Sequence, residues 1–456
     1  MTRLIFMAAA AIILSGCSGI SKLSKTNVEI PAQFDNSIMP SDSASIADLG
    51  WREFYTDSIL QTMIQKSLDN NRDLLKATAR VEEMRALLWE TKASYLPEIG
   101  AIVGGDNERT DYSGRGWDPD TELSLKATIN WEFNLWNAMK WANRKGKDSY
   151  VATIEDMRAM HITLIANTAT AYFYYTALNN ELGIVKETLK TREEALEKAR
   201  LRYEGGLTPE TVYQQAKVEY ATTASLIPNL EQQITNARNA LTLLMGEMPT
   251  DALPYDSQFT NTLLPDDISV GFTSDLLQRR PDIRAADRRL SAAMSNVGLT
   301  YANRFPSFRI NLQGGLENNT LKDFLKSPYT YLLANIAGPV FDFGKRKKKY
   351  EAAIAQYDQA RYEYEKTVIT AFTEVNSALT AYHKYRDNYI LKTDLRDAAL
   401  KYVDLAQLQY MAGSLNYIDV LDARRRYFEA QVGVSNALLD RYRSIINLYK
   451  VLGGGW

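Results

Sequence analysis

One stretch limits the folds open to this chain more than any other: residues 345–412 contain neither glycine nor proline. A continuous helix of that length would extend for roughly 100 Å, well beyond an ordinary globular core. Gly413 then permits a turn, and a helical pattern resumes at about Asn416. The sequence therefore predicts a long antiparallel helical hairpin over residues 345–452.

The amino terminus has the features of a bacterial secretory signal. A basic residue precedes an apolar run over residues 4–14, which is too short to span a bilayer as a helix. The sequence Leu-Ser-Gly-Cys follows and resembles a lipobox, so we expect removal of residues 1–16 and attachment of diacylglycerol and an N-acyl chain (palmitate) to Cys17. Because Cys17 is the only cysteine, the chain can form neither an intramolecular disulfide nor a CxxC site.

Composition argues against several classes of function. The net charge of −2 disfavours a nucleic-acid partner. Only two histidines occur, His161 and His383, and they lie far apart on predicted helices, so a histidine-based catalytic or metal centre is not expected. We therefore expect no enzymatic activity, no metal and no cofactor other than the lipid on Cys17.

The remainder of the chain is an internal repeat. Residues 73–97 align with residues 282–306, and residues 201–206 align with residues 408–413, with an offset that shrinks slightly along the chain. Such a drifting offset indicates two structural halves with small insertions. The predicted organisation is a linker over residues 17–50, a first repeat over 51–265 with a helical hairpin at 145–246, and a second repeat over 266–456.

Each repeat also contains strand-like sequence. Residues 123–133 alternate between apolar and polar side chains, the period of a strand with one apolar face, and residues 308–313 do the same. We expect strands at about 97–106, 121–135, 306–317 and 329–343, the last of which alternates poorly. Four strands are too few for a closed outer-membrane barrel, so several copies would have to share one. The alternative is a small soluble sheet packed on helices.

Three segments resemble one known family: Leu-Gln-Arg-Arg-Pro-Asp-Ile-Arg at residues 277–284, Ala-Arg-Asn-Ala-Leu at residues 237–241, and the closing residues 448–456. The chain resembles the TolC-type outer-membrane efflux channels, specifically the lipoprotein branch that serves RND-type tripartite multidrug pumps. The resemblance implies an α+β membrane protein: a homotrimer in which each chain gives four strands to a twelve-stranded β-barrel, continued by a long α-helical periplasmic tunnel.

The resemblance also assigns site residues. The two hairpin turns would be the periplasmic tips that dock the adaptor protein, at Gly205, Gly206 and Leu207 and at Gly413, Ser414 and Leu415. Tyr410, Asp419 and Asp422 would form the periplasmic gate. At i and i+3 the two aspartates share a helix face, and mutual repulsion in a trimer should raise some of their pKa values.

Two open points accompany this assignment. The alternative is that Asp419 and Asp422 lie in the first turns of a helix simply because the helix dipole favours acids there. Leu415 and Val212 stand where some members of the family carry a basic and an acidic latch residue, which leaves the closing contact unassigned.

The function implied is passive export of drugs or other small molecules. The partners would be a periplasmic adaptor, an inner-membrane RND-type transporter and outer-membrane lipid. Two alternatives remain: a structural coiled-coil envelope lipoprotein without a pore, and an outer-membrane duct for protein secretion.

Overall fold

The computed structural model describes residues 23, 26, 28–29, 45–111, 114, 116–133, 136–257, 259–260, 264, 276–338 and 341–455. The predicted signal, the lipidated Cys17 and most of the predicted linker lie outside the described residues. The chain divides into two compact units. The first is built mainly from Arg80–Ile154 and Ala285–Lys366, and the second mainly from Glu155–Arg284 and Thr367–Trp456. Each unit therefore combines segments of both sequence repeats.

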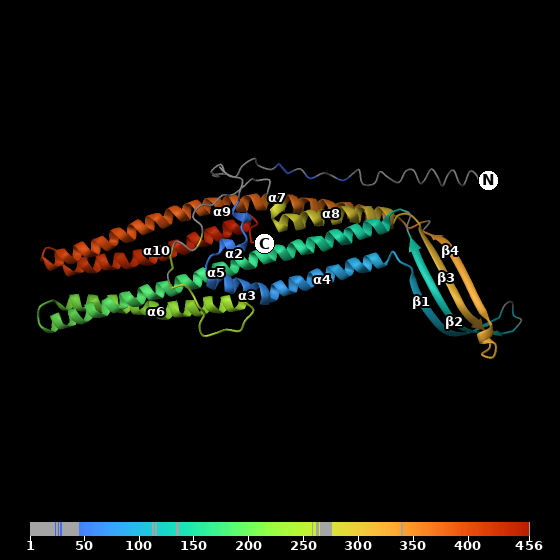
Figure 1. Ribbon diagram of the computed structural model, residues 1–456, viewed down its shortest axis with the longest axis horizontal. Helices are drawn as coiled ribbons and strands as arrows, with labels where there is room; N and C mark the ends of the chain where they lie inside the picture. Colours follow the sequence, from blue (N-terminus) through green and yellow to red (C-terminus); the bar gives the residue numbers. More distant parts are fainter. Residues whose placement is uncertain are drawn as a thin grey trace. The chain divides into compact units, whose positions relative to one another are not determined.

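The first unit contains one antiparallel sheet in the order β1-β2-β3-β4 (Figure 1). The strands are β1 (Glu98–Thr110), β2 (Asp118–Phe133), β3 (Ser307–Asn318) and β4 (Pro328–Ala337). Strands from the two repeats meet at the β2–β3 pair, where Leu125 lies opposite Leu316. The short 3-10 helix η3 (Phe324–Lys326) lies in the β3–β4 connection.

Three strand boundaries differ from the prediction by three residues or more, and one of them is the start of β2, at Asp118 instead of about residue 121. β1 continues beyond residue 106 because it pairs with β2 along its whole length, up to Thr110 opposite Asp118. β4 ends at Ala337, so the predicted strand 329–343 was too long. The residues before the next helix form its cap instead: the Asp342 carboxylate accepts hydrogen bonds from the backbone N–H groups of Gly344 (3.1 Å) and Arg346 (3.2 Å).

The helices come in pairs of equal length, as a repeated architecture requires. α4 (Arg72–Ala93) and α8 (Pro281–Ala302) have 22 residues each. α5 (Ala138–Glu204) and α9 (Lys345–Met411) have 67 residues each, and α6 (Glu210–Leu244) and α10 (Tyr417–Val451) have 35 each. The predicted uninterrupted helix after residue 345 is confirmed. The remaining helices are η1 (Ile46–Asp48), α2 (Trp51–Phe54), α3 (Ser58–Asn70) and α7 (Leu276–Arg279).

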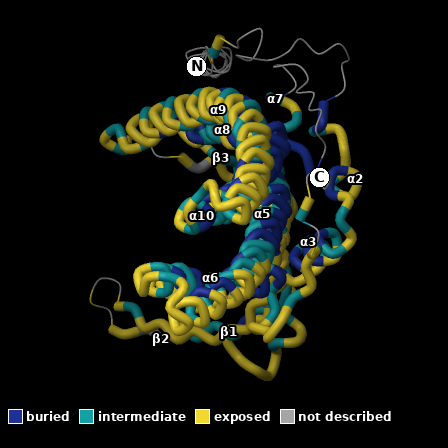
Figure 2. The backbone as a smooth tube through the Cα atoms, turned by 90° about the vertical axis from the view of Figure 1, so that its left-hand side faces the viewer, coloured by how far each residue is buried: buried dark blue, intermediate teal, exposed yellow. Residues whose placement is uncertain are grey.

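Aromatic side chains dominate the core of the second unit. Phe54 stacks on Tyr449 with ring centroids 3.9 Å apart, and Phe173 packs against Tyr442 at 4.6 Å. The Tyr449 hydroxyl donates to the Leu49 carbonyl oxygen at 2.6 Å, which satisfies the polar atom of a buried ring. By contrast, much of α9 is exposed or half-buried (Figure 2). Among the described residues, no helix combines the length and apolarity needed to cross a membrane.

Candidate functional site

Both hairpins of the second unit turn through the same motif, which explains the glycines predicted there. At the end of α5, the Leu207 N–H donates to the Arg202 carbonyl at 2.8 Å, and Gly206 adopts a φ of 69°. At the end of α9, the Ser414 N–H donates to the Gln409 carbonyl at 2.9 Å, and Gly413 adopts a φ of 75°. These are Schellman caps, in which glycine avoids the steric cost of a left-handed conformation.

The predicted docking residues do not share one environment. Five of them are exposed: Gly205, Gly206, Leu207, Gly413 and Ser414. The side chain of Leu207 is among the more exposed large apolar side chains of the described residues, at 73%. Leu415, in contrast, is half-buried and packs on the small cluster of Ala406, Val420 and Ala423. Its position therefore suits packing within its own hairpin more than contact with a partner.

Tyr410 connects the two hairpins. Its hydroxyl accepts a hydrogen bond from Arg202 Nη1 at 2.8 Å, and its ring centroid lies 5.3 Å from that of Tyr417. Arg202 belongs to the last turn of α5, and sequence reasoning did not single it out. The sequence feature that could have identified Arg202 is its position next to Tyr203, which is the repeat counterpart of Tyr410.

The two predicted gate aspartates differ in their electrostatic surroundings. Asp422 accepts from Arg425 Nη2 at 2.6 Å and from Arg426 Nε at 2.7 Å. Hydrogen bonds from Arg426 and then Arg425 hold the pKa of Asp422 below its usual range in the single chain. The rise expected from repulsion between copies of a trimer stays a prediction. Asp419 is half-buried in the first turn of α10 and has no ion-pair partner among the described residues. Asp419 is thus the aspartate of the pair whose charge is not balanced locally.

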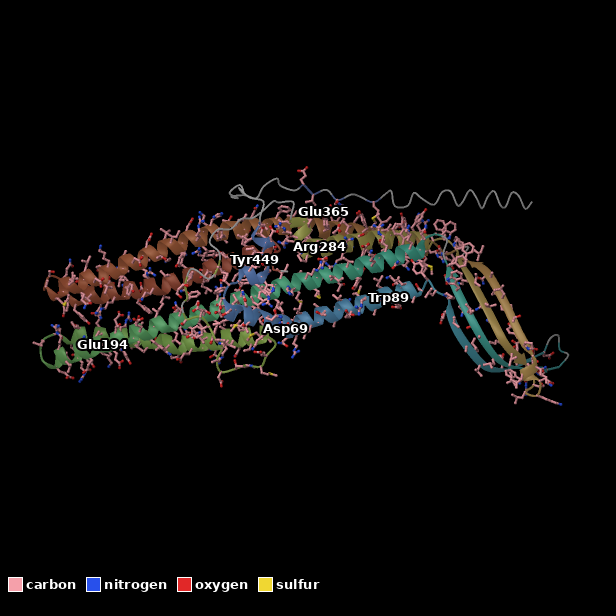
Figure 3. The ribbon with its side chains drawn as sticks, in the orientation of Figure 1. Asp69, Trp89, Glu194, Arg284, Glu365 and Tyr449 are labelled. Atoms are coloured by element: carbon pink, nitrogen blue, oxygen red, sulfur yellow. The ribbon has the colours of Figure 1, made fainter. Side chains whose placement is uncertain are left out.

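A cavity of about 450 Å³ separates the two hairpins just behind the tips. Its walls come from α5, α9 and α10 and include Glu194, labelled in Figure 3, together with Tyr410 and Tyr417. Arg192 pairs with Glu219 of its own hairpin, with Nη1 2.9 Å from Oε2, and its guanidinium reaches the other hairpin, 5.5 Å from the centroid of the Phe428 ring. Near the tips, the hairpins are therefore joined by a few contacts around a hollow, whereas farther from the tips Phe173 and Tyr442 pack between them.

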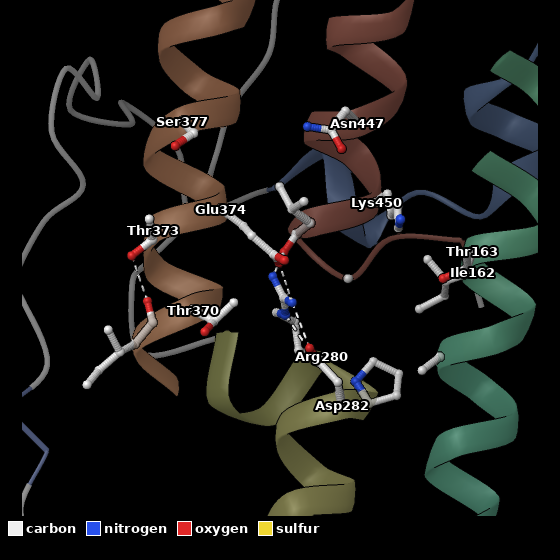
Figure 4. A pocket seen from close by; sticks show the side chains of 15 residues that line it. Ile162, Thr163, Arg280, Asp282, Thr370, Thr373, Glu374, Ser377, Asn447 and Lys450 are labelled. Carbon is white, nitrogen blue, oxygen red and sulfur yellow. Dashed lines mark hydrogen bonds and ion pairs between the residues drawn. The ribbon is translucent and has the colours of Figure 1, made fainter. Parts of the chain in front are cut away.

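A second cavity of about 570 Å³ lies beside the Arg-Arg-Pro-Asp motif. Arg280 is buried there (Figure 4) and donates to Asp282 Oδ2 and Glu374 Oε2, both at 2.7 Å, and to the Val451 carbonyl at 3.0 Å. Burial alone would lower the pKa of Arg280, but the two carboxylates raise it, so the guanidinium stays charged. One side chain thus joins α8, α9 and the end of α10. Within the described part of the chain, no three metal-ligating acids, histidines or cysteines come together.

The comparisons with known proteins agree with this architecture. Residues 63–247 and 272–454 match the family described as "Outer membrane efflux protein". The chain is 31% identical to the toluene efflux pump outer membrane protein TtgC of Pseudomonas putida, covering 100% of this chain and 96% of that protein. It is 30% identical to the probable outer membrane lipoprotein SilC of Salmonella typhimurium, covering 97% of each.

Among solved structures, the open state of the MtrE outer membrane channel of Neisseria gonorrhoeae superposes with a TM-score of 0.83 at 27% identity, covering 95% of this chain and 97% of that one. The matched segments include both hairpin tips and the Arg280 motif. The chain therefore belongs to the outer membrane efflux protein family and is the outer-membrane channel component of an efflux system.

Proposed function

We propose that three copies of this chain join their sheets into one barrel and conduct small molecules passively out of the cell. An RND-type transporter in the inner membrane would expel these molecules through a periplasmic adaptor that docks on the helical tips. The observation that carries the proposal is the sheet, whose two faces differ in chemistry and whose two outer edges are open.

One face of the sheet is apolar across all four strands. One rung places Val103, Leu125 and Leu316 side by side, and the next but one on this face places Ile99, Ile129, Leu312 and Leu332 side by side. Several of these side chains are exposed, among them Ile99, Val103 and Leu332. A continuous apolar face of this kind suits contact with lipid, because water would make its exposure unfavourable.

The opposite face is polar, and both of its cations are paired with carboxylates. Lys126 Nζ lies 2.8 Å from both Glu122 Oε1 and Glu317 Oε2. On another rung, Arg309 Nε lies 3.0 Å from Glu132 Oε2. Between these rungs stand neutral amides, which are compatible with a water-filled lumen.

The edges of the sheet support sharing between copies. β1 and β4 each pair with one neighbour only among the described residues. Their outer N–H and C=O groups would be unsatisfied in a bilayer, where an open edge is not tolerated. Three copies would supply twelve strands, comfortably above the minimum of about eight for a closed membrane barrel.

The lipid anchor and the gate are further parts of the proposal. The lipobox-like sequence and the naming of SilC as a lipoprotein support acylation of Cys17. The unbalanced carboxylate of Asp419, repeated three times around an axis, would favour cations at the aperture, with Asp422 close behind it. The exposed residues of the tips (Gly205, Gly206, Leu207, Gly413 and Ser414) would present the docking surface to the adaptor.

Purification of the full-length, lipidated protein tests the central claim. We expect a trimer in mild detergent and stepwise ionic conductance after reconstitution into a planar bilayer. A homogeneous monomer that never conducts would refute the shared barrel. The rival of a coiled-coil spacer predicts an elongated particle without conductance, and the described relatives, named as efflux pump proteins, already disfavour it.

A further inference from the structure

Five consecutive basic residues open α9, immediately after the sheet: Lys345, Arg346, Lys347, Lys348 and Lys349. The first turn of this helix contains no acidic residue. Cations at a helix N-terminus oppose the helix dipole, and neighbouring cations repel one another. Helix stability therefore does not account for this cluster.

Only part of this positive charge is balanced within the chain. Arg346 lies 3.8 Å from Asp342 and also donates to the Asn303 carbonyl at 2.7 Å. Lys348 pairs with Glu351 at 2.7 Å, and Lys347 lies 4.0 Å from the same carboxylate.

Two exposed lysines of the cluster have a charge that no described carboxylate balances. Lys345 and Lys349 are exposed and have no ion-pair partner in the described part of the chain. Arg304, two residues after the end of α8, adds a further cation. Its guanidinium lies 5.6 Å from the centroids of the Tyr301 and Tyr350 rings. The surface thus has a local excess of positive charge.

Two exposed phenylalanines precede the basic cluster. The side chains of Phe341 and Phe343 are 74% and 92% exposed, and their ring centroids lie 4.6 Å apart. Phe343 also holds a φ of 50°, a left-handed conformation that is uncommon for a bulky residue. Neither packing nor backbone preference explains a phenylalanine here, whereas contact with lipid would.

The first repeat provides an internal comparison. Phe133 aligns with Phe341, so the counterpart of the basic cluster is residues 137–141, where Lys140 is the single basic residue. The left-handed residue just before this helix is Asn137, with a φ of 63°, a residue type that tolerates it; its counterpart directly before α9 is Gly344, with a φ of 81°. The strand-to-helix junction can therefore be built without exposed aromatic rings or clustered cations.

We propose that Phe341, Phe343 and the basic residues 345–349 form a binding surface for anionic phospholipid headgroups in the leaflet that faces the helices. Apolar rings beside clustered lysines and arginines are the usual composition of a surface that recognises anionic lipid. The proposal rests on the sheet being the membrane-spanning part of the channel. In this arrangement the cations bind the phosphate groups of the lipid, and the two phenyl rings lie at the boundary between the headgroups and the acyl chains.

Native mass spectrometry of the detergent-solubilised full-length protein tests the proposal, with phosphatidylglycerol and phosphatidylcholine added in equal amounts. We expect the wild type to retain phosphatidylglycerol preferentially. Replacing Lys345, Lys347 and Lys349 by Gln should reduce this preference roughly a hundredfold, since each cation near an anionic surface contributes about fivefold. The matched control replaces three exposed lysines elsewhere, Lys76, Lys190 and Lys401, by Gln and should leave the preference unchanged.

A Phe343→Asn variant separates the rings from the charges, because asparagine tolerates the left-handed backbone. We expect it to retain less of both lipids while keeping the preference for phosphatidylglycerol. Equal retention of the two lipids by the wild type, or an unchanged preference in the triple variant, would overturn the proposal. Displacement of phosphatidylglycerol by millimolar inorganic phosphate would also overturn it, because the surface would then be a simple anion site. Conductance of the triple variant should remain normal, so this test and that of the shared barrel can fail independently.

Discussion

The contact between Arg202 and Tyr410 permits a quantitative test of how the hairpins stay together. Tyr410→Phe removes the hydroxyl that accepts from Arg202 Nη1 at 2.8 Å and leaves the ring against Tyr417. A hydrogen bond to a charged group contributes about 1.5–3 kcal/mol when shielded from water. Because Arg202 is exposed, we discount this to about 1 kcal/mol per chain.

That free energy sets the expected change in gating. If the contact is made only when the tips are closed, its loss should raise the open-to-closed ratio about fivefold per chain, and more if three copies open together. Single-channel recordings in planar bilayers would report this as a higher open probability. The matched control is Tyr203→Phe, because Tyr203 is the repeat counterpart, stacks on Tyr213 at 5.9 Å and makes no hydrogen bond through its hydroxyl to a described residue. Equal open probabilities for the wild type and Tyr410→Phe would refute the reasoning.

Four further predictions concern the site and the sheet. Asp419→Asn should reduce cation selectivity more than Asp422→Asn does, because Arg425 and Arg426 already balance the charge of Asp422. The reversal potential in a salt gradient measures this selectivity, and an equal effect of the two variants would contradict the prediction. Since its pKa is lowered, Asp422 should stabilise the tip at neutral pH, and this contribution should fade only as pH falls through that lowered pKa. Gly315→Ala should destabilise the sheet by at least ~3 kcal/mol, because a Cβ would lie 1.9 Å from the Leu125 carbonyl oxygen. Gly314→Ala is the control and should cost less than ~1 kcal/mol, because the nearest atoms to its Cβ lie at 3.9 Å. Heat-induced loss of the trimer on gels compares the two variants, and equal melting temperatures would exclude the clash. Arg280→Leu should lower the free energy of unfolding by about 2–3 kcal/mol, because it breaks the links among α8, α9 and α10. Lys450→Gln, in the same cavity, is the control and should have a smaller effect. Unchanged thermal unfolding of Arg280→Leu would show that the buried guanidinium is dispensable.

The helical prediction succeeded because its signals are local. The absence of glycine and proline from residues 345–412 and the glycine at Gly413 determine where α9 runs and where it turns. Strand alternation is equally local, and residues 123–133 show it clearly. β4 was predicted less well because Tyr331 and Leu333 interrupt the alternation on the polar face, and because the capping carboxylate of Asp342 acts only once the helix exists.

The site depended more on contacts between distant segments. The repeat located both tips and the resemblance indicated Asp419, Asp422 and Tyr410. Neither indicated that Arg202 would reach Tyr410 from the other hairpin, or that Leu415 would be packed inside its own. Neither indicated that two arginines one helical turn away would balance Asp422 and lower its pKa in the single chain; the rise expected between copies of a trimer stays a prediction.

By itself, the sequence determined the periodic elements of this protein, their duplication and the turns between them, because backbone preferences and side-chain periodicity act over a few residues. The tertiary structure alone decided which side chains meet across the hairpins, which of two similar aspartates stays unbalanced, and how strands from separate repeats align into a sheet with one apolar and one polar face. Those outcomes depend on distances between residues far apart in the chain, and such distances are fixed only when the elements pack.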